Sequence, residues 1–246
     1  MSDWFVSWFN SHYYHLLYRD RNFAEAERFI EHLLAYLDLP KGSKVLDLAC
    51  GKGRHSVQLH NAGFDVIGID LSEESISQAK TMETDGLEFF EHDMRSLYWD
   101  NYFDLVVNLF TSFGYFHNSE DDLKTICSVA DALKPNGLFV LDFLNAVKVQ
   151  NTLVAFEERV IEGVTFELNR SVTDGMIVKR IHVIDPLEDV ELDFEEQVDA
   201  LRLDDFQTYF ENAGLELMSA FGNYDLAPFD EKTSDRLIMI TRKTAV

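Results

Sequence analysis

The segment KVLDLACGKGRHSVQLHNAGFDVIGID, residues 44–70, decides the fold of this chain. Its first part, KVLDLAC, is a short run rich in β-forming residues, and the glycine pair Gly51 and Gly53 follows it directly. From Arg54 onward the sequence has a helical pattern, and a second short strand, DVIGID, ends at Asp70. Strand, tight turn, helix and strand in this order form a βαβ unit, which predicts two parallel neighbouring strands.

The same alternation of strands and helices continues on both sides of this unit. A helix is expected from Asn22 to Leu39, where apolar residues recur at intervals of three and four. LEFFEHD, FDLVVNLF and LFVLDFL are typical of further strands, with a helix from about Ser119 before the last of them, and LELMSAF and RLIMITRK close the chain as strands. We therefore predict an α/β fold, a parallel sheet with helices on both faces.

A different pattern interrupts this alternation between about Ala155 and Ala200. Apolar and polar residues alternate there with a period of two, and Asp174-Gly175 lies between two such runs as a hairpin turn. Three or four antiparallel strands are therefore expected as an insertion. The predicted organisation is a helical cap at 1–40, an α/β domain at 41–150 and 201–246, and the β insertion at 151–200.

Residues 4–18, WFVSWFNSHYYHLLY, contain eight aromatic side chains if His15 is counted, within about four predicted helical turns. Two interpretations remain open. The segment is either an amphipathic helix that seals the edge of a core, or a lid that covers a bound substrate.

The chain of 246 residues has 44 acidic and 21 basic side chains, a formal net charge of −23. Nucleic acids and anionic membrane surfaces repel a protein of this sign, so neither is expected as a partner. Two cysteines are too few for a disulfide framework, the start carries no basic leader, and no apolar run nears the ~18 residues that span a bilayer. We expect a cytoplasmic protein.

The glycine pair and an acidic residue 19 positions after Gly51 predict a nucleoside site. Glycines let the backbone approach a ligand closely, and Asp70 stands where nucleotide-binding folds place the carboxylate that accepts the ribose hydroxyls. Two residues argue against a dinucleotide: Ser56 replaces the third glycine of its fingerprint, and Asp47 would face a pyrophosphate. S-adenosylmethionine has no phosphate and carries two cationic groups, so Asp47 favours it as the cofactor.

The motifs VLDLACGKGRHS, VIGIDLS, EHDM and LKPNG resemble those of the class I S-adenosylmethionine-dependent methyltransferases, over essentially the whole chain. GKGRHS and LFTSFGYF are most similar to small bacterial enzymes of the tellurite-resistance, glycine/sarcosine and peptide N-terminal subgroups, which do not share one acceptor. The resemblance implies a Rossmann-like, seven-stranded, mostly parallel sheet, an N-terminal helical cap and a small antiparallel β insertion after the fifth strand.

The resemblance also implies roles around the cofactor. Asp47 reaches its amino group, directly or through water, and Asp70 holds the ribose diol. Leu71 packs on the adenine, Asp93 accepts from the adenine amino group and Met94 offers its backbone N–H to the ring. The expected cofactor-binding residues are Asp47, Ala49, Cys50, Gly51, Gly53, Arg54, Asp70, Leu71, Asp93, Met94, Asn108 and Phe110.

The end of the fourth predicted strand departs from a known signature of the superfamily. Many base-modifying N-methyltransferases have Asp/Asn-Pro-Pro-Tyr/Phe there, whereas this chain has Asn-Leu-Phe-Thr at residues 108–111. The segment thus disfavours a nucleobase amine as acceptor, in agreement with the net charge. Arg54 and His55 resemble the pair that follows the glycine loop in the tellurite-type relatives, although an ordinary first helical turn explains them equally well.

The implied reaction is in-line displacement of an activated methyl group by a nucleophile on a small-molecule or peptide acceptor. The protein would contribute alignment and exclusion of water, and a base only if the nucleophile arrives protonated. Cys50 is interpreted as a small space-filler, and no metal is expected because His and Cys show no ligand spacing. Candidates for catalytic residues are Tyr14, His15, Tyr18, Tyr115, His117 and Arg180.

Two other functions would share parts of this pattern. A nicotinamide-dependent oxidoreductase also needs a glycine turn and a ribose acid, but Ser56 and Asp47 disfavour it. A non-catalytic S-adenosylmethionine-binding module would keep Asp70 and Asp93 but lack an open acceptor crevice.

Overall fold

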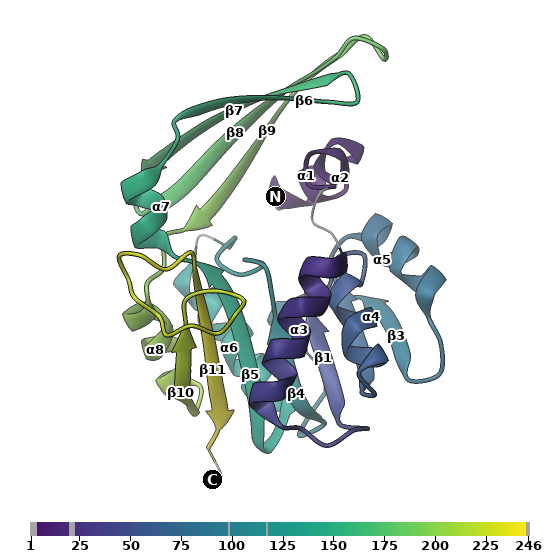
Figure 1. Cartoon of the computed structure of the whole chain (residues 1–246), viewed down its shortest axis with the longest axis vertical. Coiled ribbons are helices and arrows are strands. Elements are labelled where there is room, and N and C mark those ends of the chain that lie inside the picture. Colours follow the sequence, from purple (N-terminus) through teal and green to yellow (C-terminus); the bar gives the residue numbers. More distant parts are fainter. Residues whose placement is uncertain (1–3, 20–22, 98, 117, 245–246) are drawn as a thin grey trace.

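The computed structural model describes residues 4–19, 23–97, 99–116 and 118–244. Two sheets dominate it: a large one in the lower part of Figure 1, and a smaller, arched one above the upper edge of the first. Two short helices near the N-terminus lie beneath the arch. This arrangement leaves the functional region where the two sheets face one another.

The large sheet has seven strands in the order β10-β11-β5-β4-β1-β2-β3. The five strands from β1 to β5 pair in parallel, while β11 runs antiparallel to both β5 and β10. The predicted seven-stranded, mostly parallel α/β fold is therefore confirmed. The strand bounds are β1 Lys44–Leu48, β2 Asp65–Asp70, β3 Leu87–Glu91, β4 Phe103–Asn108, β5 Leu133–Leu144, β10 Leu215–Phe221 and β11 Arg236–Lys243.

Helices cover both faces of this sheet, and each face has its own buried core. One core joins the sheet to α6 and α8, and the other joins it to α3, α4 and α5. Strand β1 contributes to both, because Leu46 points into the first core and Val45 into the second. Parallel strands buried on both faces explain why these segments are nearly continuous apolar runs. The helix bounds are α3 Phe23–Leu37, α4 Arg54–Asn61, α5 Glu73–Ala79, α6 Ser119–Ala132, α7 Ala146–Thr152 and α8 Leu203–Asn212, with 3-10 turns at Lys80–Met82 and Met94–Ser96.

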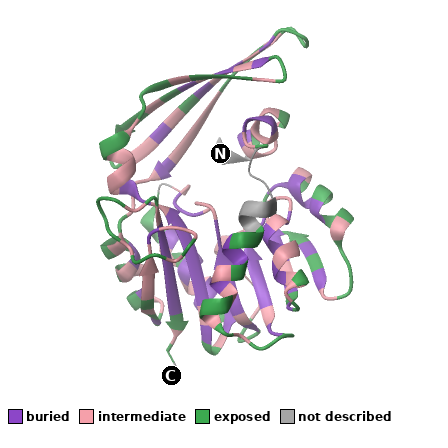
Figure 2. Ribbon diagram, viewed as in Figure 1, coloured by how far each residue is buried: buried purple, intermediate pink, exposed green. Residues whose placement is uncertain are grey.

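The predicted insertion after the fifth strand is confirmed as a four-stranded antiparallel sheet in the order β6-β7-β8-β9. Its central hairpin turns at Asp174-Gly175, as expected, with Thr173 opposite Met176. Figure 2 shows buried and intermediate positions along the inner side of the arch and exposed ones at its tip. The strand bounds are β6 Phe156–Ile161, β7 Val164–Thr173, β8 Met176–Asp185 and β9 Val190–Asp199.

The N-terminal aromatic segment forms two short helices instead of the single helix expected. The break falls between α1, Trp4–Phe9, and α2, His12–Leu17, because the Ser11 side chain accepts from the Tyr13 amide and starts a new helix. Trp8, Leu16 and Leu17 are buried against Phe166 and other apolar residues of the insertion. Helix α3 instead belongs to the core of the large sheet, so the proposed cap at 1–40 consists of two parts with different packing partners.

Within the described residues, we find no helix with both the length and the apolar character to cross a membrane.

Candidate active site

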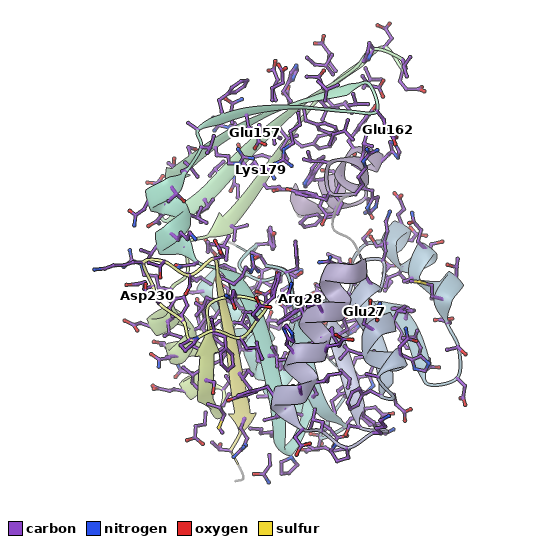
Figure 3. The ribbon with its side chains drawn as sticks, in the orientation of Figure 1. Glu27, Arg28, Glu157, Glu162, Lys179 and Asp230 are labelled. Atoms are coloured by element: carbon purple, nitrogen blue, oxygen red, sulfur yellow. The ribbon has the colours of Figure 1, made fainter. Side chains whose placement is uncertain are left out.

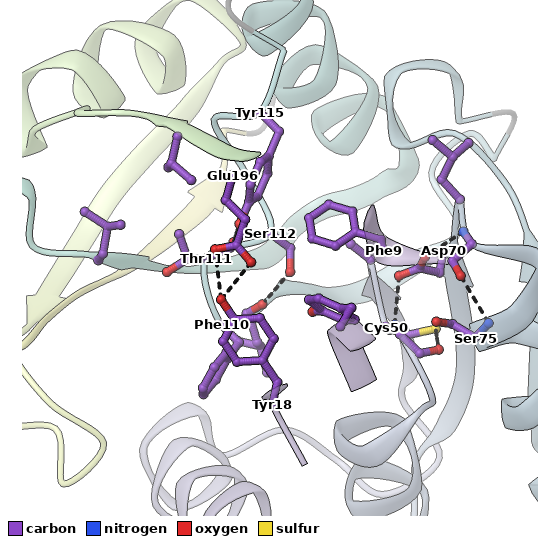
Figure 4. Close-up of a pocket in the computed structure, with 18 of the residues that line it drawn as sticks. Phe9, Tyr18, Cys50, Asp70, Ser75, Phe110, Thr111, Ser112, Tyr115 and Glu196 are labelled. Carbon is purple, nitrogen blue, oxygen red and sulfur yellow. Dashed lines mark hydrogen bonds between the residues drawn. The ribbon is translucent and has the colours of Figure 1, made fainter. Parts of the chain in front are cut away.

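A cavity of about 700 Å³ lies between the carboxyl ends of the parallel strands and the inner face of the insertion. Figure 4 shows Asp70 and Cys50 on one side of it, Glu196 and Tyr115 on the other, and Phe9 between them. Its walls therefore come from the glycine turn, the ends of β2 and β4, the N-terminal helices and the insertion. Ligands of open α/β sheets bind at this edge.

The glycine turn forms the floor on one side of the cavity. Three residues between β1 and α4 have positive φ angles: Ala49 at 60°, Gly51 at 56° and Gly53 at 80°. A β-carbon on Gly53 would come within 2.6 Å of the ring of Phe89. Both this close contact and the positive φ angle therefore require glycine at that position. Gly51 lines the cavity, whereas Gly53 lies behind it and begins α4.

Asp70 at the end of β2 is fixed by the turn beside it. The amide of Gly51 donates to Oδ2 of Asp70 at 2.8 Å, and the amide of Ser72 donates to Oδ1 at 2.8 Å. Burial raises the pKa of Asp70, although these backbone hydrogen bonds act in the opposite direction. Each oxygen keeps lone pairs for a further donor, and the carboxylate is already oriented for a diol.

Asp93 follows β3 and also lines the cavity. Its carboxylate receives the Nε of Arg95 on both oxygens, at 3.1 and 3.0 Å, and Nη2 at 2.6 Å. Burial acts to raise the pKa of Asp93, but these hydrogen bonds outweigh it and lower the pKa. An adenine amino group would thus share this carboxylate with Arg95.

Asp47 is not among the residues that line the cavity. It is 1% exposed, and its Oδ2 accepts from Oγ of Ser56 at 2.5 Å. Burial raises the pKa of Asp47 to about 6, so the carboxyl is mostly ionised at neutral pH directly behind the glycine turn. Ser56, the residue that replaces a fingerprint glycine, therefore has a clear local role. Cys50 is buried as expected, and burial raises the pKa of its thiol well above the usual value.

The end of β4 has an unusual backbone. Asn108 is fully buried and donates from Nδ2 to the carbonyl of Leu48 at 2.9 Å, so it ties β4 to β1 and does not line the cavity. Phe110 and Thr111 follow with φ angles of 66° and 60°, a left-handed conformation that is costly for a β-branched residue. Both residues line the cavity.

This strained turn is held by a buried ion pair between distant strands. Asp142 on β5 has a fully buried side chain and accepts from the Phe110 amide at 2.8 Å. Arg236, the first residue of β11, donates from Nε to Asp142 and from Nη2 to Oγ1 of Thr111, each at 2.8 Å. The hydroxyl of Tyr224 also donates to Asp142, at 3.1 Å.

A second buried network forms the wall opposite the glycine turn. Glu196 on β9 accepts from Nε1 of Trp8 at 2.7 Å and from the hydroxyl of Tyr18 at 2.7 Å. Lys179, which lies opposite Glu196 across β8 and β9, donates to it at 3.0 Å and also contacts the Tyr18 hydroxyl. Burial acts to raise the pKa of Glu196, but the charge of Lys179 and the hydrogen bonds outweigh it and lower the pKa.

Four of the six catalytic candidates line the cavity: Tyr14, His15, Tyr18 and Tyr115. Burial lowers the pKa of His15 to about 4, which makes this imidazole neutral at physiological pH. The Tyr115 hydroxyl donates to the carbonyl of Thr111 at 2.9 Å. Arg180 lies outside the cavity, 73% exposed and paired with Glu195. His117 falls outside the described residues.

Nine of the twelve predicted cofactor residues line the cavity, and Asp47, Gly53 and Asn108 stand behind it; the binding roles of all twelve stay predictions. The sequence reasoning missed Arg236, Glu196 and Lys179. The pairing of the last two depends on the register between β8 and β9, which meet at the turn of residues 186–189 and not at the Asp174-Gly175 hairpin. The nine predicted lining residues are Ala49, Cys50, Gly51, Arg54, Asp70, Leu71, Asp93, Met94 and Phe110.

The half of the cavity near Gly51 suits S-adenosylmethionine. It offers the Asp70 carboxylate for a ribose diol and the apolar side chains of Leu71 and Met94 for a flat ring. The buried charge of Asp47 behind the turn would repel a pyrophosphate and favour a cationic group. In the described parts of the chain, no group of three or more His, Cys, Asp or Glu side chains is arranged to hold a metal ion.

Comparison with known proteins agrees with this geometry. Residues 45–137 match the family model of a methyltransferase domain. YqeM of Bacillus subtilis, described as a methyltransferase, is 40% identical over 114 residues, which are 45% of this chain and 46% of that protein. Residues 45–137 therefore form a class I S-adenosylmethionine-dependent methyltransferase domain. The match to YqeM spans only about half of that relative's length.

Two further similarities extend beyond the methyltransferase domain. The cypemycin N-terminal methyltransferase of Streptomyces sp. is 27% identical over 82% of this chain and 84% of that protein. A crystal structure of an S-adenosylmethionine-dependent methyltransferase from Clostridium acetobutylicum has a TM-score of 0.80, with 22% identity over 95% of this chain and 96% of that one. The second similarity concerns the fold alone, and it includes the region of the insertion.

Proposed function

We propose that this methyltransferase transfers the methyl group of S-adenosylmethionine to a nucleophile on a small molecule or a peptide. The observation that carries the proposal is the shared cavity: Asp70 and the glycine turn form one wall, and Glu196 with Tyr115 forms the opposite one. A cofactor held at Asp70 therefore faces open space bounded by the insertion and the N-terminal helices. The cypemycin relative is named as an N-terminal methyltransferase, which supports a peptide as one class of acceptor.

The bound cofactor supplies an activated methyl group with its own leaving group. The chain then has to align the acceptor and exclude water, effects that can lower a barrier by ~7–11 kcal/mol. Phe9, Tyr14 and Tyr18 close the cavity on the side of the N-terminal helices, where they contact one another and Tyr115 edge to face. These aromatic rings form the water-excluding wall, in agreement with the lid interpretation of residues 4–18.

A proton acceptor is needed only when the nucleophile arrives protonated. His15 lines the cavity, and because burial lowers its pKa to about 4, its neutral form is present at pH 7. Its Nε2 lies 3.7 Å from Oε1 of Glu74 on α5. We propose His15 as the base for such an acceptor because its imidazole lines the cavity and is unprotonated at pH 7; its low pKa makes it a weak base.

The principal alternative is a non-catalytic module that binds the cofactor. Such a module has no need for open space beyond the methyl group, whereas here the cavity continues to Val149 and Leu153 around α7. A nicotinamide oxidoreductase is disfavoured by Asp47, which stands behind the turn where a pyrophosphate would lie.

The test has two parts. Calorimetry with S-adenosylhomocysteine measures cofactor binding, and a tritiated-methyl transfer screen over amines, amino acids, thiols, phenols and short peptides measures catalysis. We expect saturable binding and transfer to at least one acceptor class. Tight binding with no transfer to any class would favour the module, and absence of binding would refute the proposal altogether.

A further inference from the structure

The cavity reverses the charge balance of the chain. Acidic residues outnumber basic ones by 44 to 21 in the whole sequence. Among the described residues, however, the cavity walls carry only the acids Asp70, Asp93 and Glu196, against twice as many bases. The basic residues that line it are Arg19, Lys52, Arg54, Arg170, Lys179 and Arg236.

Three of these cations have a carboxylate that does not itself line the cavity. Arg236 pairs with Asp142, and Arg170, on the insertion, pairs with Glu157, which is labelled in Figure 3. Arg19 likewise pairs with Glu162. The clearest case is Arg236, because Asp142 is fully buried beside it while Arg236 itself lines the cavity; the Arg19–Glu162 pair is exposed. The cavity therefore presents guanidinium N–H groups to a ligand, while the paired carboxylates offset their charge.

Arg236 is the most firmly positioned of the three. Its side chain is 18% exposed, its Nε and Nη2 donate to Asp142 and Thr111, and its guanidinium lies 5.7 Å from the ring of Phe110. A guanidinium has five N–H groups in a planar fork, and only two of them are engaged by the described residues. Three remain for a ligand, at the edge of the sheet where β4 ends.

We propose that Arg236 binds a carboxylate of the methyl acceptor, so that the acceptor is an amino acid or another carboxylated nucleophile. This inference rests on the proposed function and names its substrate class. The planar fork suits a carboxylate because two parallel N–H groups can bind both oxygens. Asp142 acts as a positioning residue, since its carboxylate accepts from both the Arg236 guanidinium and the Phe110 amide.

A second arginine separates the acceptor from the cofactor. The cofactor has a carboxylate of its own, and two cavity-lining cations stand at the glycine turn, Lys52 within it and Arg54 at the start of α4. Arg54 contacts the ring of Phe110 at 4.4 Å, and Arg236 contacts the same ring at 5.7 Å. In this assignment Arg54 binds the carboxylate of the cofactor, and Arg236 binds the carboxylate of the acceptor.

Direct binding of simple anions tests this assignment without knowledge of the natural acceptor. Benzoate and acetate are titrated at pH 7.5 onto the protein loaded with S-adenosylhomocysteine, with binding followed by ligand-observed NMR. Benzamide and acetamide serve as uncharged probes of matched shape, and inorganic phosphate tests the other common oxyanion. We expect both carboxylates to bind saturably and at least tenfold more tightly than the amides.

Variants locate the binding site. Arg236→Met should weaken benzoate binding at least tenfold and leave S-adenosylhomocysteine affinity within threefold of the parent. Arg54→Met should instead weaken the binding of S-adenosylhomocysteine. Arg236→Lys keeps the ion pair with Asp142 and therefore the fold. It lacks the planar guanidinium that can bind both carboxylate oxygens, so it should also weaken benzoate binding. Arg242→Met, at an exposed position on the same strand, is the matched control and should change neither affinity.

Several results would overturn the assignment. They are equal binding of benzoate and benzamide, tighter binding of phosphate than of benzoate, or an Arg236→Met protein that binds benzoate like the parent. A loss of S-adenosylhomocysteine affinity in Arg236→Met would show that the anion is that of the cofactor, which also overturns it. Failure of the parent to bind S-adenosylhomocysteine at all would instead refute the proposed function.

Discussion

Replacement of Asp70 by Asn tests the cofactor half of the site most directly. The carboxylate already accepts one backbone amide on each oxygen, from Gly51 and from Ser72 at 2.8 Å. An amide side chain is nearly isosteric, but either of its orientations turns an NH₂ group toward one of these donors. The variant therefore loses the negative charge, one acceptor oxygen and the fixed orientation of the side chain.

The expected loss of affinity follows from the hydrogen bonds involved. A hydrogen bond to a charged group contributes about 1.5–3 kcal/mol, and a neutral one about 1 kcal/mol. A ribose diol makes two bonds to the carboxylate, and the Asn variant keeps at most one neutral bond. These values give a net loss of at least about 2 kcal/mol, which corresponds to a roughly 30-fold or larger increase in the dissociation constant of S-adenosylhomocysteine.

Calorimetry measures this loss, and Glu91→Gln provides the control. Glu91 ends the neighbouring strand opposite Asp70 and is exposed, so its replacement removes the same charge at the same edge without touching the diol site. Thermal denaturation of each variant shows whether the fold is intact. If folded Asp70→Asn bound S-adenosylhomocysteine within threefold of the parent, the carboxylate would not hold the ribose and our assignment would be refuted.

Three further predictions concern stability. Burial raises the pKa of Asp122 on α6 from 3.8 to about 7. The folded state therefore binds this proton more tightly than the unfolded state, and the free energy of unfolding falls as the pH rises. Between pH 5 and 8, urea denaturation should show that the parent loses about 2–3 kcal/mol more of this free energy than Asp122→Asn does. The same dependence in both proteins would contradict this. Gly53→Ala should destabilise by about 1–3 kcal/mol more than Gly51→Ala, because only the former adds a steric clash to a positive φ; equal midpoints would argue against the contact. Glu196→Gln removes the charged partner of the half-buried Lys179 and should cost about 1.5–3 kcal/mol. The control Glu195→Gln, at a more exposed pair, should cost less than about 1 kcal/mol, and equal losses would refute the distinction.

The lining of the cavity near Gly51 could be predicted because its residues are close in sequence. Gly51 and Asp70 belong to one βαβ unit, and β1 and β2 are adjacent in the sheet. Local spacing therefore becomes spatial proximity with no long-range choice to make. The hairpin of the insertion was predictable for the same reason, since a period of two and an Asp-Gly turn fix which residues face one another.

The acceptor half was largely missed because distant segments form it. Arg236 and Asp142 are 94 residues apart and meet only because β11 inserts antiparallel beside β5. No local pattern predicts that a buried aspartate and an arginine at a strand start belong together. Trp8 and Glu196 are separated by 188 residues, and their contact depends on how the N-terminal helices dock under the insertion.

The division of the N-terminal segment has a similar cause. The apolar pattern of residues 4–18 suits one continuous amphipathic helix, and its aromatic spacing gives no sign of an interruption. The Ser11 side chain caps α2 and so separates it from α1. This break is favourable because α2 can then pack its apolar face against the insertion. Tertiary packing decides between the two arrangements, and sequence periodicity does not report it.

Because β11 runs antiparallel to β5, the position of Arg236 depends on a different part of the chain from the residues around Asp70. The start of β11, and not its end, reaches the edge where the parallel strands finish, so residue 236 is delivered by the surface loop 222–235. We expect a change in the length of that loop to shift the Arg236 guanidinium while leaving the cavity-lining residues between 49 and 94 in place. If Arg236 binds the acceptor as we propose, a library confined to these fourteen contiguous positions should alter acceptor choice without a substitution at Asp70 or in the glycine turn.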